Sequence, residues 1–178
     1  ALIDNKIMAC GGTTDTYLES EEILLMENML SLLDNACQDY PLAAVMTAWL
    51  DPAGFEPNDL LMIAQYGQKQ YGHDGHFWMA VRRYADRGPD AVLADRVRRF
   101  CDWIDDLRSR AMTLRVGELI EHIYVDTGMK EQIASLPDGE MRRDLLNSFR
   151  DWAAQIADTS AMSLHCFVQH LTQIRAQR

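Results

Sequence analysis

The sequence lacks the features that mark several common classes of protein. Its four cysteines stand far apart with no CxxC pair, so they predict neither a disulfide framework nor a zinc knuckle. No apolar run approaches the roughly 20 residues of a membrane-spanning helix. The N-terminus also lacks the basic and then apolar stretches of a signal peptide. We therefore expect a cytoplasmic chain with reduced, mostly buried thiols and no membrane contact.

Positive charge is scarce in the first 70 residues, which hold 11 acidic residues against only Lys6 and Lys69. Residues 71–178 hold 16 acidic and 15 basic residues, and 14 of the basic ones are arginine. The two portions carry −9 and −1 of the net charge of −10. Because phosphate attraction depends on clustered positive charge, this balance argues against a dedicated nucleic-acid-binding domain. A local arginine patch in the second portion is still compatible with DNA contact.

Apolar residues recur with helical spacing along most of the chain. The clearest stripe steps by three or four positions through Leu93, Val97, Phe100, Ile104, Leu107 and Ala111. Long helices are predicted over about 20–37, 90–111, 116–127, 145–156 and 164–174, and shorter ones over 41–50, 58–70 and 76–87. All five prolines fall between the periodic segments or near their starts.

The fold class that follows is all-α, an irregular multi-helix bundle of about eight or nine helices. Only residues 6–10 give a strand signal, so residues 1–14 are predicted to be a linker or a short strand. A chain of 178 residues fits one domain. Residues 15–178 are accordingly predicted to form a single helical domain.

No residue pattern predicts a complete catalytic, cofactor-binding or metal site. Residues 11–14 (GGTT) have the glycines of a phosphate loop but no lysine after them, so a turn is the better interpretation. His73, Asp74 and His76 form the densest group of metal-ligand types, and short histidine-containing loops are mostly solvated turns. A solvated turn is therefore expected here.

Two groups on predicted helices have competing interpretations. Cys166 and His170 lie four positions apart, as in a metal half-site or an activated thiol, but the surrounding apolar residues favour a buried, inert thiol beside a surface histidine. Asp102, Asp105 and Asp106 are suited to acid–base or metal chemistry. The arginines around these aspartates favour an ion-paired, solvated helix face instead.

Arginine and aromatic residues are interleaved in the helix predicted over residues 76–87. Trp78, Arg82, Arg83, Tyr84 and Arg87 have the side chains that bind phosphate or stack on bases. The helical spacing favours a core position for Trp78, which leaves the arginines as the candidates for phosphate contact.

Several motifs follow one another in a distinctive order. Residues 16–23 have the sequence TYLESEEI, residues 29–35 MLSLLDN and residues 38–46 QDYPLAAVM. This order resembles the "YFESxE" and "LLxxIDNPxQDxPLAAVL" that follow helicase motif IV in the A subunit of bacterial ATP-dependent helicase/nucleases. Residues 119–128 (LIEHIYVDTG) and 136–143 (LPDGEMRR) are similar to that family's "eLIxxiyxxTG" and "lpxGeqR".

The resemblance covers about residues 15–175, with a departure at residues 47–49 (TAW), where the family usually has arginine and serine. It implies the 2B-like helical insertion of a UvrD/Rep-like superfamily 1 helicase. It also implies that the ATP and Mg²⁺ sites and the nuclease carboxylates lie in other parts of the parent protein, so this chain is expected not to be an enzyme on its own.

The role implied by the resemblance is that of an accessory domain in double-strand-break repair and recombination. Such a domain positions duplex DNA or contacts the partner nuclease subunit. Forked DNA would then be contacted weakly through Arg82, Arg83, Arg142 and Arg143.

Two other hypotheses remain open from the residues alone. One is an acidic helical protein-interaction scaffold without DNA contact, using the acidic N-terminal portion. The other is a small metal-dependent enzyme that uses His73, His76, Cys166 or His170.

Overall fold

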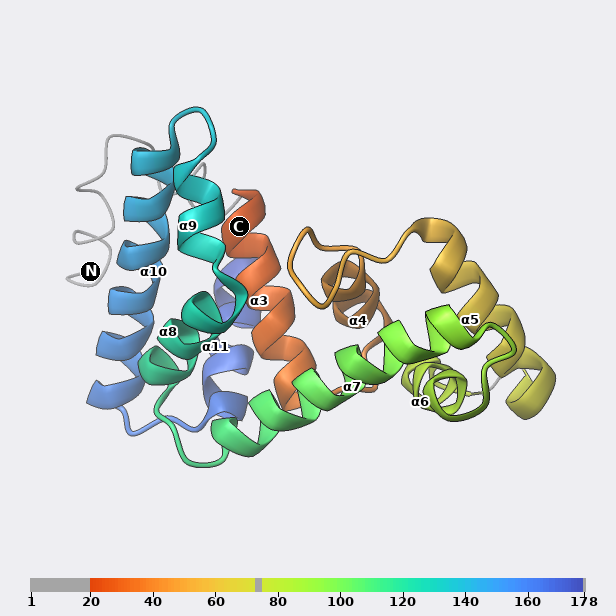
Figure 1. Cartoon of the computed structure of the whole chain (residues 1–178). Helices are drawn as coiled ribbons and strands as arrows, with labels where there is room; N and C mark the ends of the chain where they lie inside the picture. The colour runs from red at the N-terminus through yellow and green to blue at the C-terminus, as the bar shows by residue number, and fades with distance from the viewer. Residues whose placement is uncertain (1–19, 73–74, 178) are drawn as a thin grey trace. The chain divides into compact units, whose positions relative to one another are not determined.

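A computed structural model describes residues 20–72 and 75–177, all of whose regular structure is helical (Figure 1). The helices are α3 (Glu21–Asp34), α4 (Asp39–Met46), α5 (Pro57–Tyr71), α6 (Phe77–Arg87), α7 (Ala91–Ala111), α8 (Val116–Thr127), α9 (Met129–Ala134), α10 (Gly139–Thr159) and α11 (Leu164–Ala176). These nine helices and the absence of strands from the described ranges confirm the predicted all-α class. The linker or strand predicted over residues 1–14 lies outside them.

The chain divides into two compact units. Unit 2 is Asn28–Met112, and unit 1 combines Ala1–Glu27 with Thr113–Arg178. The single domain predicted over residues 15–178 stays a prediction, because compactness alone does not separate two domains from one. None of the described helices has the length and hydrophobicity needed to cross a bilayer.

In unit 2, α6 packs against both α5 and α7. Gly67 of α5 lies so close to α6 that a Cβ atom there would be 2.2 Å from the Cβ of Ala80. The predicted stripe of α7 is buried from Leu93 to Leu107, whereas Ala111 is only half-buried. The packing of amphipathic faces therefore stabilises this unit.

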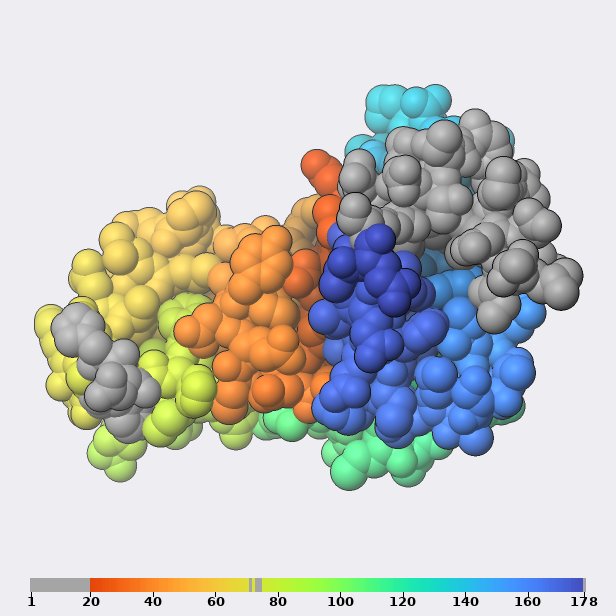
Figure 2. All heavy atoms as spheres, turned by 180° about the vertical axis from the view of Figure 1, so that it is seen from behind, coloured from red at the N-terminus to blue at the C-terminus, as the bar shows by residue number. Residues whose placement is uncertain are grey.

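In unit 1, α10 packs against α8 and α9. The α8 contact depends on Gly117, where an added Cβ would lie 2.6 Å from the Cβ of Ala154. α11 packs on α10 through the rings of Trp152 and Phe167, whose centroids are 5.9 Å apart. Figure 2 shows these two helices, in lighter and darker blue, side by side.

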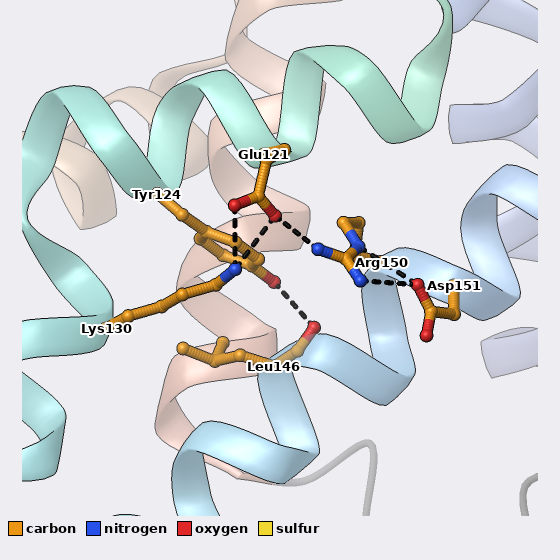
Figure 3. A network of polar contacts seen from close by, with 6 residues as sticks. All are labelled: Glu121, Tyr124, Lys130, Leu146, Arg150 and Asp151. Atoms are coloured by element: carbon orange, nitrogen blue, oxygen red, sulfur yellow. Dashed lines mark hydrogen bonds and ion pairs between the residues drawn. The ribbon is translucent and has the colours of Figure 1, made fainter.

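A polar network crosses the packed helices of unit 1 (Figure 3). Glu121 of α8 accepts hydrogen bonds from Lys130 Nζ at 2.8 and 2.9 Å and from Arg150 at 2.6 Å. Beneath it, the hydroxyl of Tyr124 donates to the carbonyl of Leu146 at 3.1 Å. Burial on its own raises the pKa of Glu121, but the hydrogen bonds from Lys130 and Arg150 outweigh it and lower that pKa.

Two helix ends differ from the predicted ones because a side chain binds the backbone there. The helix predicted to reach residue 37 ends at Asp34, because Asn35 Oδ1 accepts from the Cys37 N–H at 3.0 Å and forms a turn. The helix predicted from residue 90 begins at Ala91, since Asp90 is its N-cap.

The sequence does not predict helix α9. Gly128 has a φ of 59° and ends α8, as predicted, and the same residue is also the N-cap of α9. α9 has only six residues. A segment of fewer than two turns is too short to display a periodic stripe.

Candidate nucleic-acid interface

Helix α6 holds three of the arginines considered for phosphate contact, Arg82, Arg83 and Arg87. Its first turn is fixed by Asp39 of α4, whose carboxylate accepts from the Phe77 N–H at 3.1 Å. Ala80, Val81, Tyr84 and Ala85 form its buried face. The remaining positions therefore face away from the core of unit 2.

The outward face of α6 consists of charged residues with some apolar area. Met79, Arg82, Asp86 and Arg87 are exposed, and Arg83 is half-buried. Positions 79, 83 and 87 are each one helical turn apart and so lie along one line of the helix surface. The face offers three guanidinium groups against one carboxylate of its own helix.

Arg82 is engaged within the chain. Its guanidinium donates to Asp105 of α7 at 2.5 Å, and it lies over the ring of Trp78 with 5.6 Å to the ring centroid. The hydrogen bond to Asp105 is the main cause of a raised pKa of Arg82. The side chains of Arg82 and Asp105 are nevertheless 46% and 48% exposed, so solvent and ions reach the pair.

Arg83 and Arg87 are not neutralised in this way. Neither forms an ion pair with any residue in the described part of the chain. Arg87 is not one of the four phosphate contacts that the sequence predicts. The structure places it on the same line as Arg83, which makes these two the best-placed arginines of α6.

The aromatic residues of α6 differ in their surroundings. Tyr84 is buried, 1% exposed, with its ring edge-on to Tyr66 at 5.3 Å between centroids. Burial raises the pKa of Tyr84. Trp78, for which the helical spacing predicts a core position, is only half-buried, and the guanidinium of Arg82 lies over its ring.

The other two predicted contacts lie on α10 of unit 1 and differ from each other. Arg142 forms an ion pair with Glu22 of α3, whose side chain is only 2% exposed. Arg143 is exposed and has no ion pair within the described residues. Adjacent helical residues point about 100° apart, so one turns inward and the other outward. As phosphate contacts, both stay predictions.

Three acidic residues of the N-terminal portion form ion pairs within the fold. Glu22 is held by Arg142, and Glu27 accepts from Arg175 at 2.5 Å. In unit 2, Asp59 lies 3.3 Å from Arg96. These carboxylates stabilise helix packing, so the acidic surface available to a basic partner is smaller than the sequence suggests.

The cysteines differ from the expectation of mostly buried thiols. Among the described ones only Cys101 is buried, while Cys37 and Cys166 are exposed. The prediction of a buried thiol at Cys166 is wrong, because Phe167 and Val168 take the inward positions of α11. Burial raises the pKa of Cys101 to about 12, more than the nearby Arg82 lowers it.

The remaining candidates for metal or acid–base chemistry have ordinary surroundings or lie beyond the described part of the chain. His76 is exposed, while residues 11–14, His73 and Asp74 lie outside the described ranges. Asp106 accepts from Arg110 at 2.7 Å on the same helix. Asp105 and Asp106 are therefore ion-paired, as predicted, although Asp105 pairs with Arg82 of α6 and Asp102 has no ion pair among the described residues.

Known proteins resemble the chain along most of its length. It is 32% identical over 161 residues to the A subunit of the ATP-dependent helicase/nuclease of Lactobacillus acidophilus, which is 90% of this chain and 13% of that protein. The corresponding protein of Lactobacillus gasseri is 30% identical over 159 residues, 89% of this chain and 12% of the relative. That of Geobacillus thermodenitrificans is 28% identical over 173 residues, 95% and 13% respectively. No protein-family model matches the chain.

These similarities relate the chain to the ATP-dependent helicase/nucleases. Within that class, it is homologous to a segment of the A subunit. The chain spans about an eighth of the length of these relatives. The relation agrees with the motif order over residues 15–175.

Proposed function

We propose that this chain is an accessory helical segment of a cytoplasmic ATP-dependent DNA helicase and exonuclease that acts in double-strand-break repair and recombination. It corresponds to the 2B-like insertion of a UvrD-like motor and positions duplex DNA or the partner nuclease subunit. The observation that carries the proposal is the match to the helicase/nuclease of Lactobacillus acidophilus over 90% of the chain. The outward arginines of α6 support the DNA contact.

The chemistry of ATP hydrolysis and nuclease cleavage belongs to other parts of the parent protein in this proposal. The sequence contains no GxxxxGK[ST] pattern, so its residues do not fit the phosphates and Mg²⁺ of a nucleotide site. No catalytic step is therefore assigned to this chain. A purified sample is expected to show no ATPase activity.

The proposed DNA contact is electrostatic and weak. With a net charge of −10, the chain repels DNA at long range, and local contacts of arginines such as Arg83 and Arg87 with backbone phosphates oppose this repulsion. Such contacts carry no base information, which suits a segment that meets many sequences. Arg143 of unit 1 is the further candidate for a phosphate contact.

The test is a titration of a fluorescently labelled forked duplex with the 178-residue chain at about 50 and about 200 mM salt. We expect micromolar affinity that falls steeply with salt. Arg83→Ala and Arg87→Ala should each weaken binding and reduce the steepness of the log–log salt dependence by about 0.9 per lost phosphate contact. The matched control is Arg99→Ala, which removes an exposed arginine already paired with Asp95 at 3.5 Å.

Two outcomes contradict the DNA contact. One is nanomolar binding that does not respond to salt. The other is equal weakening by all three arginine variants, which would mean that net charge alone matters. Far-UV circular dichroism of each variant verifies that the helices are intact.

A further inference from the structure

The ion pair between Arg82 of α6 and Asp105 of α7 lies at the surface of unit 2. The 2.5 Å contact joins two side chains that are each about half exposed. An exposed ion pair contributes little to stability and is easily exchanged for another partner. A carboxylate in this position occupies the guanidinium in the way that a phosphate group would.

The surroundings of Arg82 keep its guanidinium ready for such an exchange. Trp78 lies beneath it at 5.6 Å and restricts its orientation. Arg83 follows it directly on α6 and has no ion pair within the described residues. The outward face of α6 thus carries, beside Arg83, an oriented guanidinium whose carboxylate partner is Asp105.

We propose that Asp105 acts as an internal phosphate mimic, which occupies Arg82 in the free chain and releases it to a DNA phosphate on binding. Asp105 thereby reduces the affinity of the α6 surface for DNA and keeps its contact with the duplex weak and reversible. The inference rests on the proposed DNA contact and names the residue that sets its strength. Asp105 is a positioning residue here, since it acts through Arg82.

Removing the carboxylate charge tests the exchange directly. Asp105→Asn should tighten binding of the labelled forked duplex about five- to tenfold at about 50 mM salt, while the salt dependence should stay close to that of the wild type, because Arg82 contacts a phosphate in both bound states. The matched control is Asp102→Asn, which removes an equal charge from an exposed position of α7. This control should tighten binding less than about twofold and leave the salt dependence unchanged.

A double-mutant cycle separates release of Arg82 from a general change in charge. In the Arg82→Ala background, Asp105→Asn should no longer tighten binding beyond the Asp102→Asn control. The inference is overturned if the gain persists without Arg82, or if Asp105→Asn and Asp102→Asn behave alike. Failure of the proposed DNA contact has a different signature, because Arg83→Ala and Arg87→Ala would then behave like Arg99→Ala.

Discussion

The guanidinium of Arg142 on α10 meets the carboxylate of Glu22 on α3, 120 positions earlier in the sequence. Glu22 is 2% exposed and Arg142 is 31% exposed, so the acid is shielded from water and its counterion reaches in from the surface. Breaking a buried pair costs much more than breaking an exposed one, because the remaining charge loses both water and its partner.

Arg142→Ala should therefore lower the free energy of unfolding by about 3 kcal/mol. Arg143→Ala, the adjacent and exposed arginine, should change it by no more than about 0.5 kcal/mol. Urea denaturation of the two variants measures the difference. Equal stabilities would show that Glu22 does not depend on Arg142.

The close crossing of α5 and α6 predicts an effect opposite to helix propensity. Alanine is favoured over glycine within a helix by about 1 kcal/mol, yet Gly67→Ala would place a Cβ 2.2 Å from that of Ala80. The overlap should dominate and destabilise the chain by about 1–3 kcal/mol. Thermal unfolding should show partial recovery in Gly67→Ala with Ala80→Gly. The exposed position Gln70, changed to alanine, is the control, and a stabilised Gly67→Ala would contradict the crossing.

Cysteine reactivity should separate the three described thiols. With a pKa of about 12, Cys101 is ionised in only about one molecule in 10,000 at pH 8, and its side chain is buried. Brief treatment with iodoacetamide followed by mass spectrometry should find Cys37 and Cys166 modified and Cys101 intact. The same treatment in urea should modify Cys101 as well. Rapid labelling of Cys101 in the folded chain would exclude its burial.

The network at Glu121 predicts a loss of stability in acid. Its folded-state pKa is lowered, so it contributes stability above its unfolded pKa of about 4.3, and this is lost as pH falls through the folded value. The stability difference between wild type and Glu121→Gln should be constant from pH 7 to about 5 and shrink below that. Unfolding free energies measured across this range provide the test. Glu131→Gln, at an exposed position of α9, should show no comparable trend.

The sequence predicts long helices well because their stripes are set by local spacing. The apolar stripe from Leu93 to Leu107 predicts both ends of α7 to within one residue. α9, in contrast, has too few residues to show a helical period. Local spacing also fails at Cys166, since it does not determine which of three consecutive apolar residues turns inward.

The sequence also predicts only some properties of the candidate arginines. Their residue type and their place on α6 follow from the sequence. Their ion pairs do not, because Arg82 meets Asp105 across 23 positions and Arg142 meets Glu22 across 120. These partners decide which cations remain available, and only the three-dimensional fold brings them together.

The glycine at position 128 leaves no spare residue between α8 and α9, since it closes the first helix and opens the second. Inserting one residue at this corner would rotate all of α9 by about 100° and carry Lys130 away from Glu121. Differences in length between homologous chains are therefore not expected at this joint.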